Sequence, residues 1–175
     1  MGRRCSWRRY RAASGSSTLS LRRGPRRACA ADQLTDQFQD YFGAAQTDSA
    51  TGKIHMLGAG WTITGSPTAP HAVALMIKVL WDCTNQKLPV RVELVTGDGQ
   101  PVTIPGPTGP QPVISQIDLE AGRPPGIAPG STLSAVFAVN MASIPLSPGL
   151  YEWRASVDGR TQGGSFQVMA SPAHQ

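Results

Sequence analysis

Short runs of alternating apolar and polar residues, each ended by Gly, Pro, Asp or Asn, fill most of the chain after residue 38. The clearest run is Ala72–Trp81, in which every second residue is apolar: Val73, Leu75, Ile77, Val79 and Trp81. A period of two places alternate side chains on opposite faces of a β-strand, whereas an amphipathic helix needs a period of about 3.6. The alternation therefore predicts a strand with one buried face.

Eight further runs of this kind are expected to form strands. They are residues 38–45, 53–61, 90–95, 101–104, 113–119, 133–140, 149–157 and 164–169. Three pairs are predicted to be antiparallel hairpins, closed by turns at Asp48–Gly52, Gly97–Gln100 and Asp158-Gly159, because these residues favour tight turns. Residues 35–41 are also compatible with a short helix.

Two stretches rich in Pro and Gly separate the strands of the second half. Residues 105–112 contain four prolines and two glycines, and they predict a loop because proline cannot donate to a β-ladder. Residues 122–130 predict a long connection of the Greek-key type. The expected fold is an all-β, immunoglobulin-like antiparallel sandwich of about seven to nine strands over residues 38–170. Residues 171–175 are a C-terminal tail, and Trp61, Trp81 and Trp153 are expected in the core.

The first 33 residues have a different composition. Residues 1–30 contain nine Arg and no Asp or Glu, whereas the rest has seven Lys and Arg against eleven Asp and Glu, a net charge of −4 within the total of +5. So many like charges with few apolar residues cannot offset the entropy of ordering the segment. A disordered arginine-rich head is therefore predicted over residues 1–33.

Three interpretations of this head remain open. It can be an artefact of a start site placed too early, with translation beginning near Leu34, or an organelle transit peptide, or a nucleic-acid-binding arm. In the third case the arginines would meet phosphates and the aromatic rings would stack on bases. The residues of that arm are Arg3, Arg4, Trp7, Arg8, Arg9, Tyr10, Arg11, Arg22, Arg23, Arg26 and Arg27.

The sequence also carries expectations about location. The head has no unbroken apolar stretch of the length that a secretory signal needs, and the chain has no apolar run near 20 residues. Cys83 is the only cysteine of the predicted domain, so no disulfide can form within it, which suits a reducing compartment. A cytoplasmic protein that does not bind membranes is expected.

Five segments, taken in order, resemble a known family. They are residues 53–61, 68–74, 81–82, 122–126 and 148–154, and they are similar to small bacterial proteins, mostly actinobacterial, known only as a domain of unknown function. The resemblance covers about residues 40–168. It implies a small soluble bacterial β-sandwich, and it brings no catalytic residue, activity or cofactor with it.

The residues that could support chemistry have simpler explanations. His55 and His71 could join Asp48 or Asp82 in a metal site, but no ligand spacing links them, and ordinary surface or cross-strand histidines are expected. Cys83 has no basic neighbour in the sequence to activate it, so an inert, partly buried thiol is expected.

Other candidate motifs fail on their surroundings. Asp118 and Glu120 lie on one face of a predicted strand, which a solvated surface explains as well as a glycosidase pair does. Ser131 lacks the second glycine of a nucleophile elbow. Gly58-Ala-Gly60 is followed by a strand pattern, whereas a phosphate loop requires a helix there. No catalytic, metal or cofactor residue is predicted.

Three functions are therefore carried forward. The first is a non-enzymatic binding or structural module that meets another protein through loops 105–112 and 122–130 at one end, or through an edge strand. The second is nucleic-acid binding by the head. The third is a metal-dependent or hydrolytic enzyme of unfamiliar design.

Overall fold

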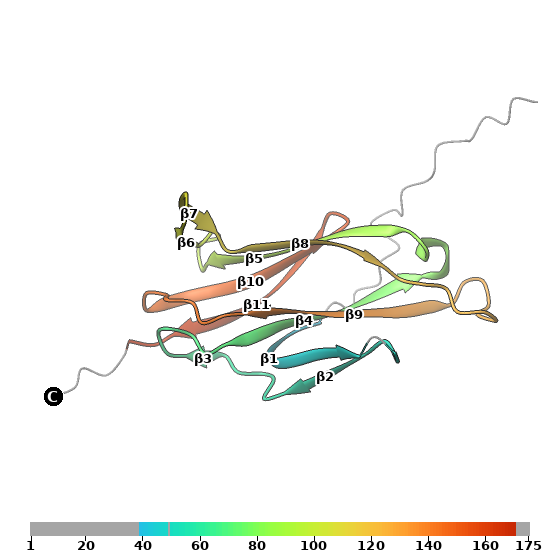
Figure 1. Cartoon of the computed structure of the whole chain (residues 1–175), viewed down its shortest axis with the longest axis horizontal. Coiled ribbons are helices and arrows are strands. Elements are labelled where there is room, and N and C mark those ends of the chain that lie inside the picture. The colour runs from blue at the N-terminus through green and yellow to red at the C-terminus, as the bar shows by residue number, and fades with distance from the viewer. Residues whose placement is uncertain (1–38, 49, 171–175) are drawn as a thin grey trace, which may run out of the picture.

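The computed structural model describes residues 39–48 and 50–170, which form two packed β-sheets and a small separate hairpin (Figure 1). The strands of this part are β1 (Gln39–Asp48), β2 (Lys53–Leu57), β3 (Ile63–Thr64), β4 (His71–Leu80), β5 (Lys87–Thr96), β6 (Thr103–Gly106), β7 (Gly109–Pro112), β8 (Ile114–Glu120), β9 (Thr132–Met141), β10 (Gly149–Val157) and β11 (Arg160–Val168). The predicted all-β antiparallel sandwich is confirmed. The head and the tail, residues 1–33 and 171–175, lie outside the described residues.

The strand order places chain-distant segments side by side. The four-stranded sheet has the order β2-β1-β4-β9, and the five-stranded sheet has the order β3-β11-β10-β5-β8. Every pair is antiparallel except β3 with β11, which is parallel. Residues 39–41 belong to β1, so the alternative of a helix is wrong for them.

The alternating residues of β4 and β10 build the core between the sheets. Leu75 pairs with Phe137 of β9, and Trp153 of β10 is 1 % exposed. Phe166 and Val168 of β11 also face inward and are buried. Burying one large apolar side chain contributes about 1.5–3 kcal/mol to the free energy of folding. The inward-facing side chains of the two sheets therefore hold the sheets together.

His71 joins the sheets and is buried, which corrects the expectation of an ordinary surface histidine. It is 5 % exposed at the start of β4. The indole Nε1–H of Trp153 donates to His71 Nε2 at 3.1 Å, and His71 Nδ1 lies 2.9 Å from the carbonyl oxygen of Ala69. Both contacts are satisfied by a neutral ring protonated on Nδ1. Burial accordingly lowers the pKa of His71.

Trp81 is not in a strand or in the core. It begins a 3-10 turn, Trp81–Cys83, and its side chain is only partly buried. Trp61, also predicted in a strand, lies after the end of β2 and packs edge-on against Phe166 and His71 from the side of the core. Of the three domain tryptophans, only Trp153 fills the core completely.

The expected loop at residues 105–112 is largely a hairpin, because β6 and β7 pair with each other from Thr103↔Pro112 to Gly106↔Gly109. The prolines sit in a two-stranded ladder whose other edges are not occupied by further strands, so their missing N–H groups cost no sheet pairing. The predicted pairing of residues 101–104 with β5 is reduced to the single bridge Val95↔Pro101. The hairpin projects from one end of the sandwich (Figure 1).

Candidate functional site: the β8–β9 side of the sandwich

The two sheets have four edge strands, and three of these strands carry features that discourage pairing with another chain. β2 is five residues long and contains Lys53 and His55, β3 has two residues, and β8 carries Asp118 and Glu120. Short length and charge are the devices by which edge strands avoid unwanted partners.

β9 has none of these features. It is ten residues long and contains no charged residue, no Gly and no Pro. Among the described residues it is hydrogen-bonded as a strand only to β4. β9 is therefore a long, uncharged sheet edge, which is the kind of edge that accepts an added strand.

The orientation of the β9 backbone follows from one hydrogen bond at its beginning. The N–H of Trp81 donates to the carbonyl oxygen of Ser131 at 2.9 Å, which continues the register of the β4–β9 pair. Because bonded and non-bonded pairs alternate in an antiparallel ladder, the odd-numbered residues of β9 bond to β4. The even-numbered residues from Thr132 to Asn140 therefore direct their N–H and C=O groups to the open edge.

The side chains of β9 that face the core are incompletely covered. Leu133, Val139 and Met141 are only partly buried, although Val139 and Met141 pack against the core. β8, the edge of the opposite sheet, contacts β9, so both edges lie on one side of the sandwich. Ile117 of β8 is 37 % exposed there, although it pairs with the buried Val90. We call this region the β8–β9 side.

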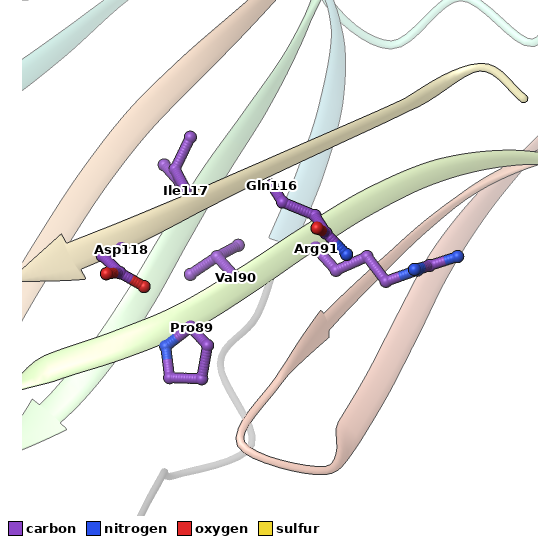
Figure 2. A pocket seen from close by; sticks show the side chains of 6 residues that line it. All are labelled: Pro89, Val90, Arg91, Gln116, Ile117 and Asp118. Carbon is purple, nitrogen blue, oxygen red and sulfur yellow. The ribbon is translucent and has the colours of Figure 1, made fainter.

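A shallow hollow of about 430 Å³ lies next to this side, between β5 and β8. Figure 2 shows its lining, with Val90 and Ile117 at adjacent positions and Pro89 and Asp118 beside them. Asp118 has an exposed ion-pair partner in Lys87 at 3.9 Å. The charged side chains in this lining are Arg91 and Asp118, and the lining contains no histidine, cysteine or serine.

The two loops proposed as one binding surface lie at opposite ends of the sandwich. The β6–β7 hairpin precedes β8, and residues 122–130 follow it, so the seven residues of β8 separate them by about 23 Å. Figure 1 shows the hairpin at the left and the 122–130 connection at the right. A single partner patch made of both loops is therefore excluded.

Arg123 fixes the 122–130 connection, a role that the sequence analysis did not identify. Its guanidinium lies 3.6 Å from the ring centroid of Trp81 and donates to the Trp81 carbonyl oxygen at 2.7 Å and to Thr84 Oγ1 at 2.8 Å. Its backbone N–H donates to Asn85 Oδ1 at 3.0 Å. Stacking and forked hydrogen bonding of this kind require arginine rather than lysine.

The outer face of the five-stranded sheet is polar and paired. Arg91 bonds to Glu93 at 2.7 Å, and Arg154 bonds to Glu152 at 3.1 Å. The hydrogen bonds that Arg154 donates to the Glu152 carboxylate are the main cause that raises the pKa of Arg154. These arginines already have carboxylate partners, so this face offers few uncommitted charges to a polyanion.

The residues considered for chemistry remain apart. His55 lies exposed on β2, His71 is committed to Trp153, and no group of three or more metal-ligating side chains occurs in residues 39–48 and 50–170. Asp118 and Glu120 are exposed on β8. The arginine and aromatic residues of the predicted nucleic-acid arm fall outside the described residues.

Cys83 differs from the expected inert, partly buried thiol. Its side chain is fully buried and disulfide-bonded. It is the only cysteine between residues 39 and 170, so no disulfide joins two residues of this domain.

Within the described part of the chain, no helix has the length and apolar character needed to cross a membrane. None of the curated proteins matches the chain. A family model described as "Family of unknown function (DUF6941)" matches residues 43–168. This match covers most of the chain and includes all of the strands from β2 to β11. The chain therefore belongs to this family of unknown function.

Proposed function

We propose that this chain is a non-enzymatic binding module that docks another polypeptide by adding its strand to the open edge of β9. The observation that carries the proposal is the contrast among the sheet edges: β9 alone among the edges of the two described sheets is both long and free of charge, Gly and Pro. Strand addition supplies main-chain hydrogen bonds for affinity and alternating side chains for specificity.

The incomplete cover of the core supports the same proposal. An added strand would lie beside Leu133 and Val139 and would remove their remaining apolar surface from water, which is favourable at about 25 cal/mol per Å². Ile117, on the opposite edge, would gain cover as well.

We also infer that the sandwich is of the immunoglobulin-like type. In that type one sheet contains strands A, B, E and D, and the other contains G, F, C and further C strands. The orders β1-β4-β9 and β11-β10-β5-β8 match A-B-E and G-F-C-C′. Tyr151 near the start of β10 donates its hydroxyl to the carbonyl oxygen of Ser147 at 3.0 Å, as the tyrosine corner of such domains does. On this assignment, the strand added at β9 occupies the position of strand D.

Hydrogen exchange tests the docking proposal. The full chain is isolated from its native host with its bound partner and again after the partner is removed, and amide exchange in β9 is compared by mass spectrometry with residue resolution. The even-numbered amides, such as Ser134 and Ala138, should be protected only in the assembly, because they face the open edge. The odd-numbered amides should be protected in both samples, because they donate to β4.

A variant gives the matched control. Ala138→Pro removes one edge N–H without touching the bonds to β4, and proline is tolerated at such positions, so the variant should fold and lose the partner. Even-numbered amides that exchange equally fast in both samples would place the partner elsewhere and refute docking at β9.

The other functions that the sequence left open have direct tests. An enzyme would need stoichiometric metal or turnover in a hydrolase screen of the purified chain, and we propose that both will be absent. Nucleic-acid binding by the head would weaken steeply between 50 and 200 mM salt, by about 10³–10⁵ for six to ten phosphate contacts, and it would vanish if translation begins near Leu34.

The cytoplasmic location and bacterial source suggested by the sequence remain proposals. Cell fractionation tests the first of them. The redox state of Cys83 in cell extracts trapped with a thiol reagent tests it independently, because a disulfide there favours an oxidising compartment.

A further inference from the structure

We infer that the strand docked at β9 is β9 of a second copy of this chain, so that two sandwiches form a dimer with a continuous sheet across its two-fold axis. This inference rests on the docking proposed above and names its partner. It follows from the sequence of β9 read against itself in the antiparallel direction.

The register is fixed by two requirements. Residues that meet across an antiparallel pair share one face, and the pairs that exchange hydrogen bonds must be those with edge-directed N–H groups, which are the even-numbered residues. The register that uses all five of them, from Thr132 to Asn140, places Val136 opposite Val136 on the two-fold axis.

Every side-chain pair in this register is compatible. On the core face, Phe137 meets the small Ala135 and Leu133 meets Val139; on the outer face, Thr132 meets Asn140 and Ser134 meets Ala138. The large Phe137 opposes a small residue, and the polar end residues Thr132 and Asn140 oppose each other. Because β9 has no charged residue, the symmetric pairing brings no like charges together, which would otherwise oppose it.

The other sheet edges do not allow the same arrangement. Self-pairing of β8 in its antiparallel direction would gather Asp118 and Glu120 of both copies along one edge, and β3 is only two residues long. β2 has five residues and carries Lys53 and His55. β9 is thus the edge that a second copy fits best, and an isologous two-fold contact is the commonest way in which soluble proteins assemble.

In the dimer, β9 of the second copy lies at the β8–β9 side, where the core is incompletely covered. The inward row of the second β9 would lie beside Leu133 and Val139 and close to Ile117, covering apolar surface that a single copy leaves in water.

The first experiment measures the mass of the full chain in solution by light scattering coupled to size exclusion. Wild type should show twice the monomer mass of 18.5 kDa. Val136→Lys should weaken the dimer by about 100-fold or more, because two ammonium groups would meet on the axis. Met76→Lys is the matched control: Met76 pairs with Val136 on the same face but lies one strand further from the edge, so this variant should remain a dimer.

The second experiment tests the register and does not depend on a destabilising change. Val136→Cys should form an intermolecular disulfide with itself under mild oxidation, located by peptide mapping so that the native cysteines are not mistaken for it. Thr132→Cys, on the same face of the same strand, should not, because its two copies would stand about 27 Å apart along the antiparallel pair.

The outcomes separate this inference from the docking proposal. A wild-type chain that stays at monomer mass at high concentration overturns the second copy as partner, and protected even-numbered amides in an assembly with another protein would then still support docking at β9. A dimer that tolerates Val136→Lys and in which Val136→Cys does not cross-link is formed by another surface and also overturns the inference. Even-numbered amides left unprotected in every assembly refute docking itself.

Discussion

Two side chains decide how the parts of this domain are joined. His71 links the sheets through Trp153, and Arg123 fixes the 122–130 connection to the turn at Trp81. Each is a polar residue whose partner is more than 40 positions away in the sequence. Buried or stacked polar groups of this kind stabilise only when all of their hydrogen-bonding groups are satisfied.

The neutral state of His71 predicts a pH-dependent stability. Burial lowers its pKa in the folded protein below the ordinary value of 6.5, so the unfolded chain takes up a proton at a higher pH than the folded chain does. Above pH 6.5 the ring is neutral in both states, so its titration does not change the free energy of unfolding. As the pH falls below 6.5, the free energy of unfolding should decrease by up to about 1.4 kcal/mol per pH unit until the folded ring is protonated.

Urea denaturation followed by tryptophan fluorescence between pH 5 and 8 measures this slope. His71→Gln offers an amide oxygen to the Trp153 indole and does not titrate, so it should flatten the profile in this window. His55→Gln, at the exposed histidine of β2, is the control and should leave the slope unchanged. An identical slope in wild type and His71→Gln would assign the pH dependence to other groups.

At the scale of elements, the β6–β7 hairpin stands apart from both sheets. The two strands of the hairpin pair only with each other. The hairpin contacts the core through Ile104, which is partly buried and packs against the core cluster. Gly109 adopts φ +118° at its tip, a conformation that residues with a Cβ rarely adopt. The hairpin is therefore a local structure supported by its own turn and by one apolar contact.

Replacing residues 105–110 with Asn-Gly should shorten the hairpin without unfolding the sandwich. The new two-residue turn would join Ile104 directly to Gln111, which pair across the ladder, and Asn-Gly favours the turn type that such a connection needs. Thermal unfolding by circular dichroism should shift by only a few degrees. The matched change, Ile104→Ala in the unshortened chain, should destabilise more, since it removes the contact with the core.

At the scale of the whole molecule, one core spans both sheets. Leu75 of β4 and Trp153 of β10 belong to the same buried cluster, which reaches from β4 to β11. The sandwich should therefore unfold as a single unit, as small domains with one core do.

Leu75→Ala tests this unity. Removing a buried leucine side chain should lower the free energy of unfolding by about 2–5 kcal/mol. Tryptophan fluorescence, which reports on the surroundings of the indole rings including the buried Trp153, and far-ultraviolet circular dichroism, which reports on all strands, should shift to the same new midpoint. Two separate transitions would mean that the sheets unfold independently. Thr161→Ala, at an exposed position of β11, should change the midpoint little.

The sequence by itself determined the class of fold and most of the strands. β4, β8, β9 and β10 were each predicted within one or two residues, because alternation of apolar residues over seven or more positions is a local pattern that turns at Pro, Gly and Asp interrupt. Phe166 and Val168, two positions apart in β11, show the same period of two and are both buried. The wrong predictions also came from local patterns. The four prolines of residues 105–112 predicted a loop, although part of this segment pairs as β6 and β7. The alternation of β4 continued to Trp81, although Trp81 begins a 3-10 turn.

Only the tertiary structure decided the candidate site. The sequence of β9 predicts a strand, but whether that strand ends a sheet depends on which strands pair, and those contacts join segments far apart in the chain. The burial of His71, the clamp of Arg123 on Trp81 and the placement of the two loops at opposite ends depend on the same non-local pairing. The local sequence pattern determines on which face of its strand a side chain lies. Which residues that side chain contacts is determined by strand pairing and by the packing of the two sheets on one core.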